Sequence, residues 1–324
     1  VPAFPMADMP KGIDLGLSIN VMLLITSIAS MLGAGFIVYS SLSHNLQKGK
    51  LHLQIVCSMA ITDFLFAIKF FMSACMYLAK DFSIVTSLSV PCYVSAWMGQ
   101  FFGLGTISWN FIITLNLFLM LRFPFRYKRW SKSGYTIGYY HAYVWSLSFL
   151  TCMIAHVSGA MKFTKDGTCW LQGSFIFSFY APLYFYTVFA IGVIVYAAVK
   201  LDVNGQARHG TGVKSRKRAI RMVSQMIVFS MGFLAVWFWG IVFRLLEYTN
   251  SGNASYVPDI YVNYASTFFL GFGGFVNAMI WSGRVITKDS CVYRMKNCSC
   301  CSVDASVRDR SSSAASNVSN VEMQ

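Results

Sequence analysis

Long apolar stretches alternate with short polar ones along the whole chain. Seven stretches reach the length of about 20 mostly apolar residues that a helix needs to cross the hydrocarbon core of a bilayer. They cover residues 18–42, 51–79, 91–121, 135–160, 173–200, 216–247 and 259–283. The gaps between them are polar and rich in Gly, Ser, Lys or Asp. The pattern predicts an all-α integral membrane protein, built as a bundle of seven transmembrane helices.

The composition agrees with this prediction. The 324 residues are 56% hydrophobic and 12% charged, whereas soluble domains carry about 25% charged residues. Outside the bundle (18–283), we expect an extracellular N-terminus at 1–17, a juxtamembrane helix at 284–301 and a disordered, Ser-rich cytosolic tail at 302–324. Disorder is expected in the tail because it lacks apolar residues in a periodic pattern.

The distribution of basic residues predicts the orientation. The formal charge is +14, and 20 of the 26 Lys and Arg lie in alternate gaps (residues 48–50, 122–132 and 200–221) or after the last stretch. Because cytoplasmic loops carry the excess of Lys and Arg, the N-terminus is expected outside and the C-terminus inside. Such loops face anionic membrane lipids, so the positive charge does not indicate nucleic-acid binding.

Two ionic side chains interrupt the second apolar stretch. At 1.5 Å per residue, Asp63 lies about 18 Å into the membrane, and Lys69 lies roughly 9 Å farther along and on another side of the helix. Each therefore needs its own partner or a wet cavity inside the bundle. For Asp63 we expect a polar core with Asn110, Asn116 or Asn277 and water. A structural or protonated carboxyl group is the alternative.

Lys69 and Arg244 lie at similar depths near the predicted outer mouth, on the second and sixth stretches. Together they could bind an anionic group through charge-assisted hydrogen bonds. Two alternatives stay open: Lys69 extends to the outer interface, and Arg244 pairs with Glu247 or Asp259. Two aromatic residues, Trp170 and Trp237, could stack on a flat ligand, although aromatic residues are abundant in this chain and core packing is the simpler role for Trp237.

The cysteines separate by compartment. Cys92 and Cys169 fall on the predicted outer side, where disulfides persist, and they are the two cysteines there. We therefore predict that they pair, with two free thiols as the alternative. Asn253 begins an Asn-Ala-Ser sequence on the same side and is a predicted N-glycosylation site.

A second group of cysteines follows the last apolar stretch, in "DSCVYRMKNCSCC". Its spacing lacks the two paired ligand clusters of a structural zinc site, so no metal is predicted. Juxtamembrane cysteines beside basic residues are typical palmitoylation sites, with unmodified thiols as the alternative. The predicted sites are Cys298, Cys300 and Cys301.

Several functional classes lack support in the sequence. A retinal protein would need a Schiff-base lysine, usually in the last span, and residues 259–283 contain none. The motifs HExxH, GxSxG and the P-loop are absent, so neither an enzyme nor a cofactor is predicted. A small seven-span transporter or channel stays open as an alternative to a receptor.

Short motifs in six of the seven spans and in the second outer loop, taken in order, resemble one receptor family. They are Ser30-Met31-Leu32-Gly33, Asp63-Phe64, Pro91-Cys92-Tyr93, Cys169-Trp170, "FYAPLYF" (179–185), "VWFWGIVFRLLE" (236–247) and "GFGGFVNAMIW" (271–281). The pattern resembles the cyclic-AMP receptor-like, or class E, G-protein-coupled receptors first known from social amoebae. The Asp-Arg-Tyr and Asn-Pro-x-x-Tyr motifs of rhodopsin-like receptors are absent.

The resemblance implies a multi-pass receptor of the plasma membrane that senses a small molecule outside and activates a heterotrimeric G protein inside. The expected ligand is anionic and cyclic-nucleotide-like, although this resemblance does not establish it. The residues expected at the ligand site are Lys69, Trp170, Trp237, Arg244 (which coincides with an arginine of the family) and Glu247.

G-protein coupling is expected at the inner ends of two helices. The stretch "KSRKRAIRMVSQMIVF" has neither Gly nor Pro, which predicts one helix that continues from below the bilayer into the sixth span. The alternative is that its cations contact only anionic lipids. The residues expected to couple are Arg122, Arg126, Arg216, Lys217, Arg218 and Arg221.

Overall fold

The computed structural model describes residues 15–43, 51–78, 90–163, 169–207, 213–249 and 260–297. The chain forms two compact units, Val1–Ala278 and Met279–Gln324. In the described part, the second unit consists of the C-terminal portion of one helix, which ends at Asn297. The cavity and the side-chain clusters described below lie in the first unit.

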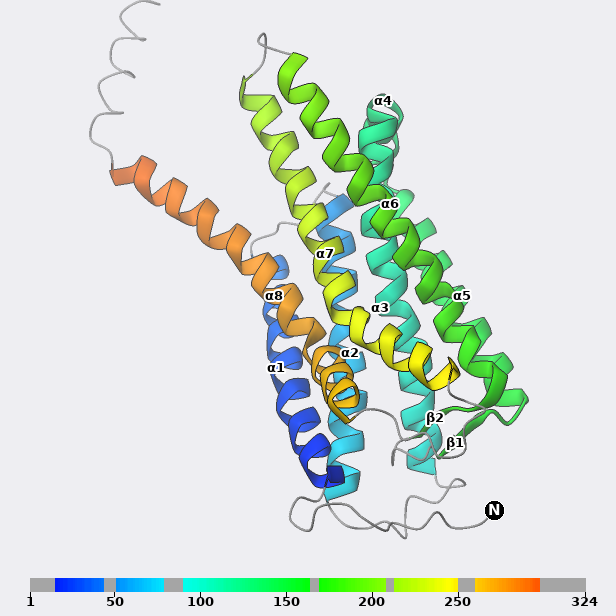
Figure 1. Ribbon diagram of the computed structural model, residues 1–324. Coiled ribbons are helices and arrows are strands. Elements are labelled where there is room, and N and C mark those ends of the chain that lie inside the picture. Colours follow the sequence, from blue (N-terminus) through cyan, green and yellow to red (C-terminus); the bar gives the residue numbers. More distant parts are fainter. Residues whose placement is uncertain are drawn as a thin grey trace, which may run out of the picture. The chain divides into compact units, whose positions relative to one another are not determined.

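The described residues are almost entirely helical (Figure 1). The first half of the chain forms α1 (Leu15–Ser43), α2 (Leu51–Leu78), α3 (Val90–Arg122), α4 (Pro124–Trp130) and α5 (Thr136–Val157). The second half forms the strands β1 (Met161–Phe163) and β2 (Cys169–Leu171), the 3₁₀-helix η1 (Gly173–Ile176), α6 (Phe177–Ala207), α7 (Val213–Thr249) and α8 (Ile260–Asn297).

Five helical segments are long and apolar enough to cross a membrane: Leu17–Leu42, Leu51–Leu78, Cys92–Arg122, Ser174–Lys200 and Met222–Leu246. These segments confirm a helical membrane bundle. Helices also form where the other two spans were predicted, in α5 and α8. The first half of α5 reads "TIGYYHAYVW", and its tyrosine, histidine and tryptophan side chains lower its hydropathy. Seven crossings and their orientation stay predictions.

Helix α3 is the central element of the first unit. It packs against α2, α5, α6, α7 and both strands (Figure 1). Small residues permit this packing: a Cβ atom at Gly103 would lie 2.9 Å from a ring carbon of Phe66 and 3.0 Å from one of Phe179. Helices in lipid gain little from hydrophobic association, so close van der Waals packing of this kind holds them together.

The two strands form an antiparallel hairpin against α3, with Lys162 opposite Trp170 and Phe163 opposite Cys169. The turn after α5 uses Gly159, whose φ of 64° favours glycine. Sequence analysis predicted neither the hairpin nor α4. Strands of three residues are too short for a period-2 pattern to be recognised, and α4 is a seven-residue helix that starts at Pro124.

Helix α7 confirms the prediction of one continuous helix between the basic segment and the sixth span. Its 37 residues correspond to about 55 Å, which exceeds the roughly 30 Å of a bilayer core. Helix α8 continues through residue 283, where the last span was predicted to end. The separate juxtamembrane helix and the tail therefore stay predictions, and residues 298–324 lie outside the described part.

Close contact between α1 and the first half of α8 should depend on glycine. The Gly274 N–H donates a 2.7 Å hydrogen bond to Ser30 Oγ, and a Cβ atom at Gly271 would overlap with Thr26 Oγ1. We expect Gly271→Ala to lower stability by about 1–3 kcal/mol, the usual cost of overpacking. The measurement is the Tm of the purified protein.

The matched control for this substitution is Gly35→Ala on α1, where an added Cβ atom would meet nothing within 4 Å. Alanine is a better helix former than glycine, so this control should keep or slightly raise the Tm. Equal Tm values for Gly271→Ala and Gly35→Ala would contradict the close packing of α1 and α8.

Candidate functional site

Two polar centres lie on α2, around Asp63 and Lys69. Each side chain is 5% exposed. Six residues along an α-helix correspond to a rotation of about 240°, so the two groups face different neighbours. Their environments differ accordingly: Asp63 lies in a polar cavity, whereas Lys69 lies among aromatic rings near the hairpin.

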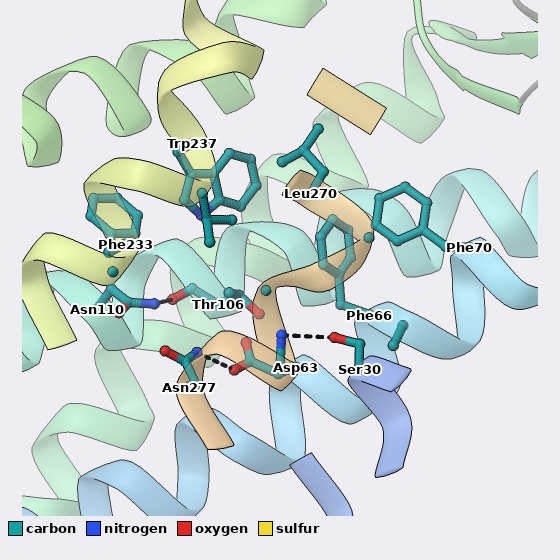
Figure 2. A pocket seen from close by; sticks show the side chains of 16 residues that line it. Ser30, Asp63, Phe66, Phe70, Thr106, Asn110, Phe233, Trp237, Leu270 and Asn277 are labelled. Carbon is teal, nitrogen blue, oxygen red and sulfur yellow. Dashed lines mark hydrogen bonds between the residues drawn. The ribbon is translucent and has the colours of Figure 1, made fainter. Parts of the chain in front are cut away.

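The polar cavity is lined by residues of α1, α2, α3, α7 and the first half of α8 (Figure 2). Asn277 Nδ2 donates a 2.8 Å hydrogen bond to Asp63 Oδ2. The space open to the centres of water molecules is about 20 Å³. This exceeds the roughly 10–15 Å³ that one water requires, but lies far below the roughly 300–1,000 Å³ of pockets for organic ligands.

Of the three predicted partners of Asp63, the structure brings two to the cavity. Asn277 binds the carboxylate, and Asn110 lines the same space. Asn116 lies elsewhere: its Nδ2 donates to Ile112 O at 2.8 Å, and its Oδ1 accepts from Tyr140 OH at 3.1 Å. Asn116 therefore ties α3 to α5.

Near the hairpin, a second group of residues surrounds the two predicted cations. We call Lys69, Gly99, Trp170, Tyr180 and Arg244 the hairpin-end cluster. A Cβ atom at Gly99 would lie 3.3 Å from Lys69 Cε and 3.6 Å from Trp170 Cδ1. Arg244 Nε donates to Tyr180 OH at 3.2 Å, and Arg244 Cζ lies 5.6 Å from the Trp170 ring centroid. Trp170 therefore lies next to Arg244 and, around Gly99, close to Lys69.

Among the described residues, the Lys69 ammonium group makes neither a hydrogen bond nor an ion pair. The ammonium group lies over the Phe70 ring, whose centroid is 4.6 Å from Nζ. Cation–π contact contributes about 0.5–2 kcal/mol, less than the cost of removing an ion from water. A buried ammonium group with an aromatic ring as its partner is therefore suited to receive an anion.

The two predicted stacking tryptophans have different surroundings. The Trp170 ring packs edge-on against Phe179 at 5.1 Å, and its buried Nε1 has no hydrogen-bond partner among the described residues. Trp237 is 4% exposed and lies against Phe66 and Phe179 at 6.4 and 5.7 Å. The structure places Trp237 in the core beside the polar cavity, which agrees with the packing alternative.

Comparison with known protein families identifies the family of this chain. The family model for the slime mold cyclic AMP receptor matches residues 11–291. The protein belongs to that receptor family.

Individual relatives agree with the assignment. The receptor is 23% identical over 249 residues to cyclic AMP receptor-like protein F of Dictyostelium discoideum, a match that covers 68% of this chain and 78% of the relative. It is 22% identical over 232 residues to adhesion G-protein coupled receptor D1 of Bos taurus, covering 70% of this chain but 23% of that longer protein. Both matches support a receptor of the G-protein-coupled type.

Other predicted site residues are described only in part. Arg122 and Arg126 are exposed and approach the Phe123 ring at 5.2 and 5.8 Å. Cys92 is disulfide-bonded, but the side chain of Cys169 lies outside the described part, so their pairing stays a prediction. The same holds for the side chains of Arg216, Lys217, Arg218, Arg221 and Glu247, and for Asn253, Asp259, Cys298, Cys300 and Cys301.

Sequence reasoning missed several residues of both centres. Tyr180 lies within the "FYAPLYF" motif that carried the resemblance, but no feature of that motif indicated a contact with Arg244. Three further residues at these centres are small or uncharged. Gly99 lies beside Lys69, and Thr106 and Ser30 line the cavity beside Asp63. Such residues are frequent in all membrane helices, so no sequence signal separated Gly99 and Thr106 from the rest. Ser30 belongs to a motif of the resemblance, but that motif did not indicate a place beside Asp63.

The unpaired Lys69 gives a prediction about stability. We expect Lys69→Met to raise the Tm of the ligand-free receptor, because replacing a buried charge by an apolar side chain of similar size typically stabilises by about 1–4 kcal/mol. Lys200→Met is the control: Lys200 is partly exposed and donates to Tyr196 OH, so its replacement should change the Tm little. A lower Tm for Lys69→Met would show that the ammonium group has a partner in the receptor.

Proposed function

We propose that this receptor binds a small anionic molecule from outside the cell at the hairpin-end cluster, and activates a heterotrimeric G protein at its other end. The observation that carries the proposal is the buried Lys69 ammonium group, which has no anionic partner among the described residues, in the same cluster as Arg244. Phosphate and carboxylate groups form strong, charge-assisted hydrogen bonds with such cations.

Aromatic rings of the cluster favour a ligand with a flat ring beside its anionic group. Trp170 and Tyr180 lie 6.0 Å apart, and the Arg244 guanidinium lies within 6 Å of both rings. Aromatic faces bind flat ring systems by stacking. A cyclic-nucleotide-like molecule carries both features. The buried Trp170 Nε1–H group, which has no partner in the part of the chain that the structure describes, could donate a further hydrogen bond to such a ligand.

The hairpin is the proposed extracellular cover of this site. Its strand β2 carries Trp170 and packs on α3. A disulfide between Cys92, in the first turns of α3, and Cys169, next to Trp170, would fix the tryptophan over the cluster. The predicted orientation agrees, since the basic segments lie at the opposite end of α3 and at the start of α7. We propose the plasma membrane as the location of the receptor.

Receptor activity and ligand transport can be separated in one preparation. The receptor would be reconstituted in liposomes with a heterotrimeric G protein and tested with cyclic AMP and a panel of other phosphate and carboxylate compounds. Ligand-dependent guanine-nucleotide exchange without flux of the ligand supports the proposal. Saturable flux without nucleotide exchange would instead identify a transporter or channel.

Arg244 provides a graded test of the ligand site. We expect Arg244→Ala to weaken the potency of the activating compound about ten- to a hundredfold, because a charge-assisted hydrogen bond contributes about 1.5–3 kcal/mol. Arg244→Lys should lose less, since the charge remains although the planar fork of donors is lost. Dose–response curves for nucleotide exchange measure both effects. Unchanged potency in Arg244→Ala and Lys69→Met would remove both residues from the site.

Coupling is proposed at the basic start of α7, which continues into the bundle without a break. We expect changing Arg216, Lys217, Arg218 and Arg221 together to Gln to abolish nucleotide exchange while ligand binding persists, because the G protein would lose its contacts with this helix. Exchange assays and ligand binding on the same vesicles measure the two properties. Normal exchange by this variant would mean that these cations contact lipid and that coupling occurs elsewhere.

A further inference from the structure

A buried amide on α3 leaves its oxygen atom without a hydrogen-bond donor. The Gln100 side chain is 0% exposed, and its Oε1 has no partner among the described residues. Its Nε2 donates to Ser178 Oγ, on α6, at the long distance of 3.5 Å. Because an unpaired polar group in the interior lowers stability, such a group usually serves a function or has a partner from outside the chain.

The hydrogen bonds of Ser178 determine which atom of the amide is unpaired. The Ser178 hydroxyl donates to Phe175 O at 2.7 Å, so its oxygen atom is left to accept a bond from Gln100. A side-chain amide donates through its nitrogen atom and accepts through its oxygen atom. The Nε2 group of Gln100 therefore faces Ser178, and Oε1 is the atom that stays available.

Gln100 borders the hairpin-end cluster. It directly follows Gly99, a member of that cluster, along α3. Its contact on α6, Ser178, closely precedes Tyr180, which is another member. The Trp170 ring reaches the same part of α6, with its centroid 6.0 Å from that of Tyr180. The available oxygen atom therefore belongs to the surroundings of the proposed ligand site.

The hydrogen-bond donors and acceptors of this region do not pair with one another. The Lys69 ammonium group and the Trp170 Nε1–H group are donors, and neither makes a hydrogen bond within the described ranges of the chain. Gln100 Oε1 is an acceptor, and neither of these donors binds it. An anion satisfies the two donors but not the acceptor. A molecule that pairs with all three groups must also carry a donor of its own.

We infer that Gln100 determines the ligand specificity of this receptor, and that the ligand carries an N–H or O–H group in addition to its anionic group. Gln100 Oε1 accepts a hydrogen bond from that group. The inference rests on the proposed function and narrows the anionic ligand to compounds with an amino, amide or hydroxyl group. A site built to hydrogen-bond such a group strongly rejects analogues that lack it, because the buried acceptor is then left unpaired.

The test uses cyclic AMP and two analogues, one without the 6-amino group and one without the 2′-hydroxyl group. These are the two N–H or O–H donors of the parent compound. Potency is measured as guanine-nucleotide exchange by the full receptor in liposomes with a G protein. On the wild-type receptor, we expect one analogue to be about ten- to a hundredfold weaker than cyclic AMP. On Gln100→Met, that analogue and cyclic AMP should be equally potent, because the acceptor that distinguishes them is removed.

Asn116→Leu is the matched control. Asn116 is also an amide of α3 with 0% exposure, but its Nδ2 and its Oδ1 are both hydrogen-bonded. The control should lower the Tm and keep the difference in potency between the analogue and cyclic AMP. Gln100→Met should keep or raise the Tm of the ligand-free receptor, because it removes a polar group without a full set of partners. A Tm lowered as much as in Asn116→Leu would show that Oε1 has a partner within the receptor, and would overturn the inference.

Three further results would overturn the inference and leave the proposed function standing. Equal potency of all three compounds on the wild-type receptor would mean that water, not the ligand, occupies Gln100 Oε1. An analogue that is weakened equally on the wild-type receptor and on Gln100→Met would place the contact at another residue. Activation by anions that lack an N–H or O–H group, and by no others, would show that no donor is needed. Absence of exchange with every anionic compound tested would instead refute the proposed function itself.

Discussion

Burial of ionic side chains inside a bundle of apolar helices is the constraint on which this structure depends. Water is scarce in the bundle, so each buried charge must find a partner, and the helices must pack closely enough to present one. Helix α2 carries two such charges of opposite sign that face different sides of the helix. Asp63 is held by an amide of α8. Lys69 is met by an aromatic ring of its own helix.

An aromatic layer lies between the two centres. Phe66, Phe70 and Trp237 line the polar cavity, and Phe179 contacts both Trp237 and the Trp170 ring of the hairpin-end cluster. Packed side chains of this kind move between discrete arrangements, since close-packed interiors do not deform continuously. Under the proposed function, a ligand that draws Trp170 and Arg244 together would repack this layer and thereby change the surroundings of Asp63.

Sequence reasoning found the helices and the charged residues but not the geometry around them. Apolar length located most helix ends to within a few residues, because the bilayer sets how many apolar residues a crossing requires. The exceptions are α6 and α8, which continue beyond the ends predicted at residues 200 and 283. Asp63, Lys69 and Arg244 stood out because charge is rare in such segments. The choice of Asn277 over Asn116 as the partner of Asp63 depends on helix rotation and tertiary contact, which spacing alone does not specify.

The hairpin also could not be predicted from the sequence. Strands of three residues are too short to show a pattern, yet β2 places Trp170 beside both cations of the cluster.

The most direct test of the account is an experimental structure of the receptor purified with a compound that activates it. The account predicts density for an anionic group within hydrogen-bonding distance of Lys69 Nζ and the Arg244 guanidinium. A Lys69 side chain paired with a carboxylate of its own chain, with the compound bound elsewhere, would contradict it.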